Sequence, residues 1–599
     1  MLTLKRTGAI IASMLVAYVA AQLGSDVFLA DGLDIIDIVR ITLLAATSGW
    51  IAWGSSLAIG GLFAPAHPLV ATRPVRDGVL TAVLVPVYNE EPSKTFSHVA
   101  AMSRSVEKAG LSSRFEFSVL SDTTRDDVGE AELVWFQRLR DTVPAGPALY
   151  YRRRPRNIGR KAGNIAEFIR TAGARYDYLI ILDADSLMEA STFQAMVERM
   201  EADEKLGLLQ TLPKIVHARS WFGRAIQFSS FFFSPVFARG LGLLQGREGP
   251  FWGHNAIVRT RAFAESCGLP DLPGKPPFGG HVLSHDYVEA ALLARAGWTV
   301  RVDPDLEGSY EEGPDNVIDF AKRDRRWCQG NLQHSRIISA PGLKPWSRFT
   351  FAQGIMAYVA SPLWLVFLVA SILAPALAPE PDYFPVPRFP AVFPRAETLQ
   401  AITLLGGVIA LLIGPKLLIA LRSVLTGEAD RFGGAARVTS STLVEVVWSS
   451  ILAPVTLMFQ SRSVWQVLSG ADSGWPSADR EAEAVGMREA WASAWWIVLT
   501  GVLLLAGTAL LAPELFYWFV PIALPLTVAP WLISASSRPS GGAWAGRRGL
   551  FRTPAETELP DVVRMQEAVL AAWRGAPLPV AEAMAMPEAG AAARPATEH

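Results

Sequence analysis

Apolar residues are concentrated in blocks at both ends of the chain, and a long central stretch of mixed polarity separates these blocks. Near the amino end, residues 9–23 and 41–63 are each about long enough to cross a hydrocarbon core of ~30 Å as a helix. Further blocks follow the central stretch, at residues 351–374, 399–421, 443–458, 495–511 and 516–533. The pattern predicts a multi-pass membrane protein with one large domain outside the bilayer.

Basic residues set the expected orientation of the spans. Lys5-Arg6 precedes the first block and Arg73–Arg76 follows the second, so both flanks of an amino-terminal hairpin face the cytoplasm. Seven spans would place the arginine-rich tail outside. We therefore expect six spans, with residues 443–458 lying at the interface or re-entering, or eight spans if one has been missed.

These boundaries divide the chain into four parts. The parts are an amino-terminal hairpin (1–70), a cytoplasmic domain with interfacial helices (77–345), a membrane and channel region (349–535) and a cytoplasmic tail (537–599). The tail ends in an Ala/Pro/Glu-rich stretch and is expected to be partly disordered. Within the third part, the polar stretch at about 461–491 is interpreted as a gating loop. In the second part, the apolar segment 222–237 is interpreted as one amphipathic helix on the bilayer.

Short apolar runs in the central domain predict strands that are buried on both faces. These runs occupy residues 80–86, 115–120, 148–151 and 179–182. Helical segments alternate with them, for example at residues 164–174. The alternation predicts an α/β fold, an open and mostly parallel sheet with helices on both faces.

Acidic residues follow three of the predicted strands, namely Glu90, Asp122 and the pair Asp183 and Asp185. Ligands bind at the carboxyl ends of the strands in open sheets, and this arrangement is typical of a nucleotide-diphosphate crevice. The pair suits Mg²⁺ or Mn²⁺, because such a hard ion takes its remaining ligands from water and phosphate. A solvated Asp-rich turn is the alternative.

Composition excludes some classes of protein. Half of the 599 residues are hydrophobic and 19% are charged, with a formal net charge of -1, so no overall field indicates a nucleic-acid partner. The two cysteines, Cys267 and Cys328, cannot form a disulfide framework and lack metal-ligand spacing.

Further motifs follow Asp185 in order: Phe251-Trp-Gly-His-Asn255, Leu283-Ser-His-Asp-Tyr287, Arg323-Asp-Arg-Arg-Trp-Cys-Gln-Gly-Asn331 and Asp472-Ser-Gly-Trp475. Together with the aspartates they resemble the processive family 2 glycosyltransferases, the group of the cellulose and hyaluronan synthases. Their details are closest to one branch, whose members make osmoregulated periplasmic glucans. The resemblance covers about residues 80–535. It departs from the family at Arg323, where Gln is usual.

The resemblance implies a GT-A type fold, a UDP-glucose donor and transfer with inversion. Asp122 and Glu90 would hold the uridine side of the donor, and Asp183 and Asp185 would bind the metal. Lys161 would place a charge near the phosphates. A solvated cation at a helix start is the alternative for Lys161.

On the acceptor side, Asp286 would be the general base, although it also suits the N-cap of the helix that follows. Arg326 would contact the diphosphate, bidentate if the geometry permits. Trp327 would stack on the acceptor sugar or belong to the interfacial aromatic belt. His254 and Asn255 would line the acceptor site, and packing roles stay open for both.

The resemblance therefore implies an enzyme of the bacterial inner membrane that polymerises glucose into a β-1,2-glucan and exports it to the periplasm. Its expected partners are UDP-glucose, the growing glucan and membrane lipids. The resemblance alone implies two further partners, a periplasmic glucan-biosynthesis protein and an acyl carrier protein. The alternatives are synthesis of another β-glycan such as cellulose or chitin, transfer of one sugar to a lipid carrier, and a transporter or receptor with an inactive domain.

Overall fold

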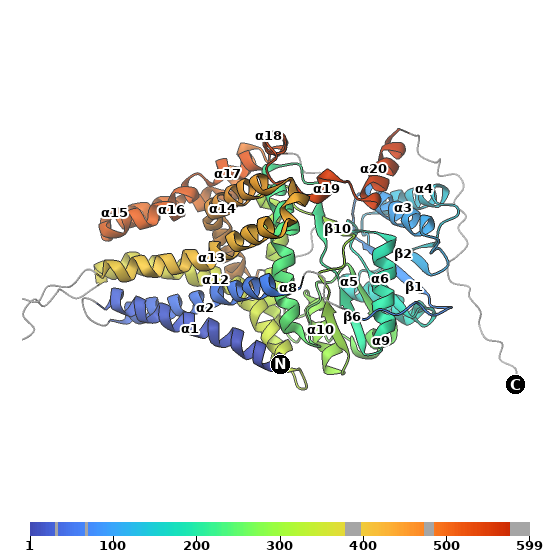
Figure 1. The fold of residues 1–599 in the computed structure, drawn as a ribbon, viewed down its shortest axis with the longest axis horizontal. Coiled ribbons are helices and arrows are strands. Elements are labelled where there is room, and N and C mark those ends of the chain that lie inside the picture. Colours follow the sequence, from blue (N-terminus) through green and yellow to red (C-terminus); the bar gives the residue numbers. More distant parts are fainter. Residues whose placement is uncertain (30–33, 66–69, 378–396, 472–483, 576–599) are drawn as a thin grey trace, which may run out of the picture.

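The computed structural model describes residues 1–29, 34–65, 70–377, 397–471 and 484–575. A bundle of long helices stands beside an α/β domain, and shorter helices lie between the two (Figure 1). The amino terminus is at the junction of the two units.

A seven-stranded sheet forms the centre of the α/β domain. Its strands are β1 (Thr81–Val87), β2 (Phe115–Ser121), β3 (Ala148–Arg153), β4 (Tyr178–Ile181), β6 (Leu206–Gln210), β8 (Ala256–Arg259) and β9 (Thr299–Val302). They are arranged in the order β3-β2-β1-β4-β8-β6-β9. Only β8 runs antiparallel to its neighbours β4 and β6, whereas the other pairs are parallel. The predicted mostly parallel sheet is confirmed.

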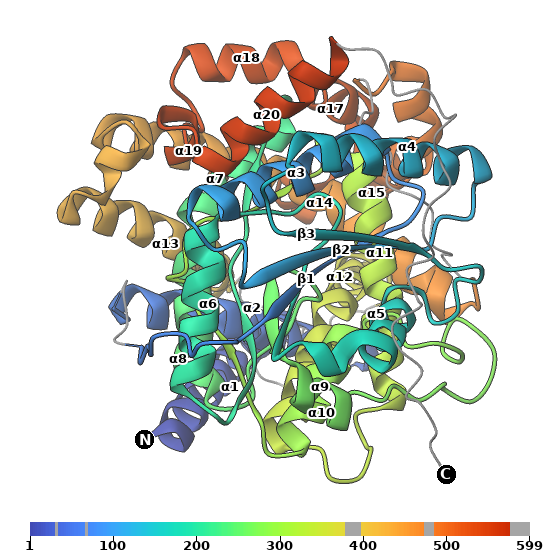
Figure 2. The same cartoon turned by 90° about the vertical axis from the view of Figure 1, so that its right-hand side faces the viewer.

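Helices cover both faces of this sheet (Figure 2). One face carries α3 (Pro92–Lys108), α4 (Asp126–Thr142) and α6 (Ala190–Ala202), and the other carries α5 (Arg160–Ala172), α9 (Thr260–Ser266) and α10 (His285–Arg295). Successive side chains of β1 alternate between the two cores: Val83 packs with Phe96 of α3, and Leu84 packs with Ile165 of α5. Burial on both sides explains why the strands are continuous apolar runs in the sequence.

A second, three-stranded sheet lies beside the first. It consists of β5 (Leu187–Met188), β10 (Ser309–Glu312) and β7 (Lys214–Val216), in that order. Directly after β10, the helix α11 (Val317–Gln333) carries the motif with Arg326 and Trp327. This small sheet therefore brings α11 close to the end of β4.

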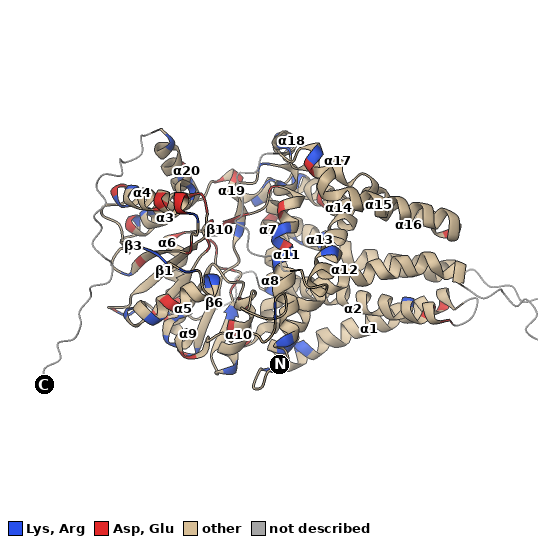
Figure 3. Cartoon of the chain, turned by 180° about the vertical axis from the view of Figure 1, so that it is seen from behind, with Lys and Arg blue, Asp and Glu red and all other residues tan. Residues whose placement is uncertain are grey.

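Six helices among the described residues are long and apolar enough to cross a membrane. They are α1 (Leu2–Phe28), α2 (Ile35–Phe63), α12 (Pro345–Leu377), α13 (Thr398–Thr426), α14 (Ala435–Leu468) and α15 (Met487–Leu511). Seen from behind in Figure 3, charged residues gather on the α/β domain and at its junction with the bundle, and they are sparse along the long helices. The chain is a membrane protein.

The sequence-based expectation for residues 443–458 is wrong, because these residues lie within the long helix α14. The irregular segment is instead α16 (Phe516–Thr527) followed by α17 (Ala529–Ser536), which meet at 56°. Pro521, Pro525 and Pro530 fall in or beside this break. Proline removes a backbone donor and clashes with the preceding turn, which bends a helix. The described residues contain six candidate spans if the bent pair is left out. They contain seven if the bent pair is counted as one span.

The segment expected to form one amphipathic helix is divided into α7 (Trp221–Phe232) and α8 (Ser234–Gln245). Phe228 and Phe232 are buried against Phe432 and Phe551, so these aromatic side chains pack inside the protein. α8 packs closely on α2 where small residues allow the backbones to approach each other. A Cβ added at Gly61 would lie 1.8 Å from the carbonyl oxygen of Val236.

The described part of the tail is folded, which the sequence analysis did not foresee. It forms α18 (Pro539–Arg547), α19 (Pro554–Thr557) and α20 (Asp561–Arg574). Val562, Val563 and Trp573 of α20 are buried in the core that contains α3. Residues 576–599 lie outside the described residues.

The ends of the expected gating loop are helical, because α14 extends to Leu468 and α15 begins at Met487. The central part of that loop, 472–483, lies outside the described residues, and with it the motif that begins at Asp472.

Candidate active site

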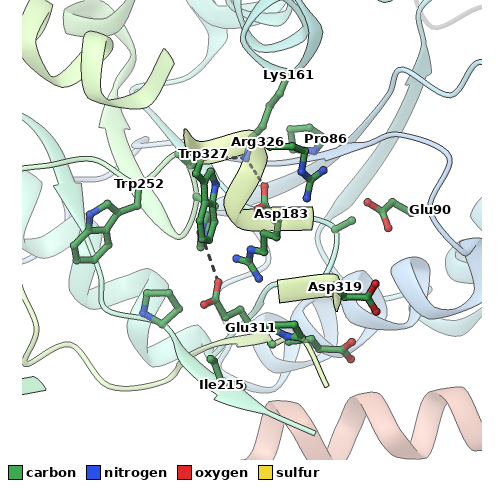
Figure 4. A pocket seen from close by; sticks show the side chains of 18 of the residues that line it. Pro86, Glu90, Lys161, Asp183, Ile215, Trp252, Glu311, Asp319, Arg326 and Trp327 are labelled. Atoms are coloured by element: carbon green, nitrogen blue, oxygen red, sulfur yellow. Dashed lines mark hydrogen bonds and ion pairs between the residues drawn. The ribbon is translucent and has the colours of Figure 1, made fainter. Parts of the chain in front are cut away.

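A cavity of about 1390 Å³ lies between the ends of the strands, α11 and α20. Most of the predicted site residues line it, namely Glu90, Asp122, Lys161, Asp183, His254, Asp286, Arg326 and Trp327. In Figure 4, Trp252, Trp327 and Glu311 lie to one side of Asp183, and Glu90 lies to the other. We call Glu90, Asp122, Lys161 and Asp183 the strand-end wall. We call Trp252, His254, Asp286, Glu311 and Trp327 the mixed wall, because loops, a strand and helices contribute to it.

Asp122, at the end of β2, is fixed by a buried arginine. Its two carboxylate oxygens accept hydrogen bonds from Nε and Nη2 of Arg154, at 2.6 and 2.8 Å. Arg154 also donates to the carbonyl oxygens of Ile158 and Arg160, which holds the following loop against Asp122. This pair was not predicted from the sequence, since the partner of each arginine depends on the fold.

Lys161 lies in the first turn of α5 and connects the two walls. The preceding Gly159 has φ +69°, a left-handed conformation that allows the chain to turn into the helix. The Lys161 ammonium donates to the carboxylate of Asp183 and, at 2.8 Å, to the carbonyl oxygen of Gly253 (Figure 4). The alternative of a freely solvated cation is therefore wrong.

The two aspartates after β4 lie in different environments. Asp183 lines the cavity, whereas Asp185 is 5% exposed and is not among the lining residues. The Asp185 carboxylate lies near enough to His98 to act on that ring, whose pKa burial lowers to about 4. The expected placement of both carboxylates on the cavity surface is thus met by Asp183 alone.

These aspartates fit a divalent ion that takes most of its ligands from elsewhere. Within the described ranges, no group of three or more His, Cys, Asp or Glu side chains is arranged to hold a metal. Asp183 and Asp185 supply hard oxygen donors, and Mg²⁺ is commonly bound by one or two carboxylates together with water and phosphate oxygens.

Asp286 lies in the first turn of α10, and Ser284 occupies the N-cap position. The alternative that Asp286 is the N-cap is therefore wrong. Its carboxylate lies against Gly253, where an added Cβ would be 3.4 Å from Oδ2. Burial raises the pKa of Asp286, and the nearby imidazole of His285 opposes this shift. A carboxylate with a raised pKa is a stronger proton acceptor.

The neighbouring His285 is engaged away from this carboxylate. Its Nδ1 lies 3.0 Å from Oε2 of Glu289, one turn along α10. Burial works to lower the pKa of His285, but the Glu289 carboxylate outweighs it, so the pKa is raised. His285 therefore helps to orient the start of α10.

Two tryptophans belong to the mixed wall. Trp327 of α11 keeps 45% of its surface exposed, and the guanidinium of Arg323 lies 4.6 Å from its ring. Trp252 also lines the cavity, although the sequence analysis assigned it no role. A planar aromatic face in the wall of an open cavity suits the C–H face of a sugar.

The loop that carries Trp252 and His254 is held by Gln210 at the end of β6. The side-chain oxygen of Gln210 accepts from the Trp252 backbone N–H at 3.1 Å, and its Nε2 donates to the His254 carbonyl oxygen at 2.9 Å. Gln210 is fully buried. Gln210 was not predicted, because its role depends on the placement of β8 beside β6.

Asn255 does not line the cavity, although it was expected to line the acceptor site together with His254. It is fully buried with φ +50°. Its side chain bonds to Ser186, Ser309 and Tyr310. It therefore ties the turn after β4 and the strand β10 to the loop of the mixed wall.

A chain of ion pairs leads from the cavity to the tail helix. Glu312 of β10 accepts from Lys94 at 2.6 Å and lies 3.3 Å from Nδ1 of His217. Burial works to raise the pKa of Glu312, but His217, His98 and Lys94 together hold it well below its usual value. Nε2 of His217 lies 3.3 Å from Glu567 of α20, which lines the cavity. The tail is thus part of the site.

Sequence matches to known proteins identify the family of the chain. Residues 82–266 match the family described as Glycosyl transferase family 2, and residues 178–413 match Glycosyl transferase family group 2. The chain is 52% identical over 553 residues to a glucans biosynthesis glucosyltransferase H from Cereibacter sphaeroides, covering 92% of each chain. It is 39% identical to a protein of the same name from Vibrio cholerae, covering 90% of this chain and 76% of the relative.

One solved structure, a mannosyltransferase from Pyrobaculum calidifontis in complex with GDP-Man and Mn²⁺, is 18% identical with a TM-score of 0.44. The match covers 65% of this chain and 96% of that one. This likeness is too low to support an argument about the site.

Proposed function

We propose a specific reaction for this chain, which belongs to the glucans biosynthesis glucosyltransferase H family and is a membrane-bound glucan glycosyltransferase. The reaction is the transfer of glucose from UDP-glucose to the end of a growing β-1,2-glucan, with inversion at the anomeric carbon. Members of this enzyme class act on a nucleotide-sugar donor and a glycan. The proposal adds three specific points to this class: UDP as the nucleotide, glucose as the sugar and β-1,2 as the linkage.

One observation carries the proposal: Asp286 and Asp183 line the same cavity, and Lys161 connects them. Lys161 bonds to Asp183 and to Gly253, and Asp286 lies against Gly253. A donor whose diphosphate lies at Asp183 would therefore present its sugar near Asp286. Trp252 and Trp327 lie in the same cavity, where an acceptor sugar can stack.

Asp286 then acts as the base. Its carboxylate takes the proton of the acceptor hydroxyl while that oxygen forms a bond to the anomeric carbon. The bond between the anomeric carbon and the UDP oxygen breaks, and UDP leaves with the electron pair. Attack from the face opposite the leaving group converts an α-linked donor into a β-linked product.

Two cationic side chains of the cavity are proposed to offset the charge of the leaving group. The Lys161 ammonium and the Arg326 guanidinium both line the cavity and are proposed to approach the diphosphate. A divalent ion held by Asp183 and Asp185 would supply Lewis-acid stabilisation of the same charge when bound. Glu90 and Asp122 are proposed to lie on the uridine side. Asp122 is oriented for this by Arg154.

The cavity also reaches the membrane helices, because Tyr358 of α12 is one of its lining residues. This supports export of the glucan through the bundle from a domain on the cytoplasmic side of the inner membrane. The positions of the basic flanks support the same orientation. A periplasmic glucan-biosynthesis protein and an acyl carrier protein remain partners proposed from the family alone.

The test is turnover by the purified full chain in nanodiscs, with UDP-glucose and Mg²⁺. We expect UDP release together with a glucan whose linkage analysis gives β-1,2 bonds. A β-1,4 product would replace the proposed linkage with that of cellulose. Release of UDP only from another UDP-sugar would retain the chemistry and overturn the assignment of glucose.

Removal of divalent ions tests the metal part separately. We expect a chelator to reduce transfer by at least ~100-fold, because the charge on the leaving diphosphate is then uncompensated. Adding back Mg²⁺ or Mn²⁺ should restore transfer in the wild type but not in Asp183→Asn. Full activity in the chelator would refute metal binding at this pair.

A further inference from the structure

A chain of buried hydrogen bonds runs from the strand-end wall to the mixed wall. Oγ of Ser186 accepts from the backbone N–H of Asp183 at 2.9 Å and donates to Oδ1 of Asn255 at 2.5 Å. Nδ1 of His254 lies 3.3 Å from the same Oδ1. The turn after β4 is therefore connected to the imidazole ring of His254.

These partners fix the orientation of the Asn255 amide. Its Nδ2 donates to Oγ of Ser309 at 2.8 Å and to the carbonyl oxygen of Tyr310 at 3.4 Å. Oδ1 is therefore the acceptor toward Ser186 and His254. We assign a ring proton of His254 to Nδ1 on this ground, so Nε2 is the ring nitrogen on the side of Glu311.

Nε2 of His254 faces a second acceptor in the cavity. It lies 3.5 Å from Oε2 of Glu311, and both residues line the cavity. This separation is longer than an ordinary hydrogen bond, so neither side chain is held tightly by the other. The pair has room for donors from a ligand, and sugar hydroxyl groups are such donors.

The surroundings point to the acceptor sugar. His254 lies in the same loop as Trp252 and Gly253, and Asp286 packs against Gly253. A sugar stacked on the tryptophans would therefore have hydroxyl groups beside both Asp286 and the pair formed by His254 and Glu311. We propose that this pair binds hydroxyl groups of the acceptor sugar and so determines which hydroxyl reaches Asp286. The inference rests on the proposed function and names the residues that select the linkage.

Glu311→Gln is the most informative variant. It keeps the shape of the side chain but introduces an amide N–H that can donate to Nε2 of His254. The pair is then satisfied internally, and a charged acceptor for the sugar is lost. Glu307→Gln is the matched control, since Glu307 is exposed, pairs with Arg431 and does not line the cavity.

The first readout is binding of a β-1,2-linked glucose disaccharide, followed by tryptophan fluorescence in the full chain in nanodiscs. We expect Glu311→Gln to weaken this binding by about tenfold or more, because a hydrogen bond to a charged group is lost. UDP affinity should stay unchanged, which also shows that the variant is folded. Glu307→Gln should bind both ligands as the wild type does.

The second readout is the product. We expect Glu311→Gln to release more free glucose per UDP and to give a glucan with mixed linkages. His254→Phe should do the same, and His254→Gln, which keeps an acceptor oxygen, should restore part of the transfer. Unchanged disaccharide affinity, product and linkage in Glu311→Gln would overturn the proposal.

The failure of this inference can be distinguished from failure of the proposed function. If the wild type makes no glucan from UDP-glucose, the function is wrong. A difference in disaccharide binding between the wild type and Glu311→Gln would still support the subsite. If the wild type makes the glucan and Glu311→Gln makes the same product at the same rate, the subsite alone is wrong.

Discussion

The strand-end wall and the mixed wall of the cavity are built by different means. The strand-end wall is fixed by buried or partly buried ions, such as Asp122 with Arg154 and Asp183 with Lys161. The mixed wall is held largely by neutral hydrogen bonds, from Gln210 and Asn255. The strand-end wall is thus built from ion pairs near strand ends. The mixed wall is built from side chains of loops, a strand and helices that are far apart in the sequence.

The difference matters because the two kinds of contact have different energies. Breaking a buried ion pair costs about 3–5 kcal/mol, whereas a neutral hydrogen bond contributes only about 0.5–1.5 kcal/mol net. The nucleotide diphosphate is the same in every cycle, and a rigid wall suits it. The acceptor end is a new sugar each time, and a wall with weaker contacts can release it. We expect substitutions in the mixed wall to change the product and those in the strand-end wall to abolish donor binding.

The largest effect is expected for Asp286→Asn. An amide cannot take the proton of the acceptor hydroxyl, so transfer should fall by about 10²–10⁴-fold, the usual contribution of a general base. UDP affinity should not change, because Asp286 belongs to the mixed wall. Turnover and UDP binding are measured side by side. Asp271→Asn, an exposed site outside the cavity, is the control. If Asp286→Asn turns over at the wild-type rate, Asp286 is not the general base.

Arg154→Ala should have the next largest effect, and it should act on the donor. Asp122 would remain buried without its partner, which costs about 3–5 kcal/mol, so UDP affinity should fall by about 100-fold or the domain should unfold at lower temperature. Isothermal calorimetry and thermal melting separate these outcomes. The neighbouring Arg156→Ala is exposed and should change neither. If Arg154→Ala binds UDP normally, the strand-end wall does not depend on this pair.

The pH dependence of transfer should report Asp286. Because burial raises its pKa above the ordinary value of 3.8, the base becomes protonated at a higher pH than an exposed aspartate would. Transfer should therefore be full above that raised pKa and fall by about tenfold per pH unit below it. The measurement is kcat/KM against pH, with UDP affinity followed over the same range. An acid limb at the ordinary value would contradict the assignment.

The smallest effect is expected for Trp327→Ala. A ring contact is worth about 0.5–1.5 kcal/mol beyond burial, so KM for the acceptor should rise by about two- to tenfold with little change in UDP affinity. Trp327→Phe should restore most of the wild-type KM for the acceptor. Trp465→Ala on α14 is the control, since that ring is 70% exposed and outside the cavity. Equal effects of both alanine variants would assign Trp327 to the interfacial belt.

The strand-end wall could largely be predicted from the sequence, because its residues follow short local patterns. The run at 80–86 became β1 (Thr81–Val87), and the run at 115–120 became β2 (Phe115–Ser121). The first acidic residue after such strands, for example Asp122 or Asp183, lies at the edge of the sheet that borders the cavity. The helix expected at 164–174 formed slightly earlier, as α5.

The mixed wall could not be predicted in the same way. Its geometry depends on β8 lying antiparallel between β4 and β6, and this determines the position of Gln210 beside the loop before β8. Neighbouring residues within one motif also differ in direction. His254 faces the cavity and Asn255 is buried behind it, as Asp183 and Asp185 differ after β4. The contribution of α20 depends on packing between segments hundreds of residues apart.

The contact between α2 and α8 has a mechanical consequence. Added Cβ atoms at Gly61 and Gly240 would lie 1.8 and 1.9 Å from backbone oxygens of the facing helix, so the two backbones touch directly. At these two positions no side chain separates the helices. The amino-terminal hairpin therefore anchors the catalytic domain in the bilayer as a fixed support. If the glucan leaves through the bundle as proposed, this contact would resist displacement of the α/β domain while the product moves.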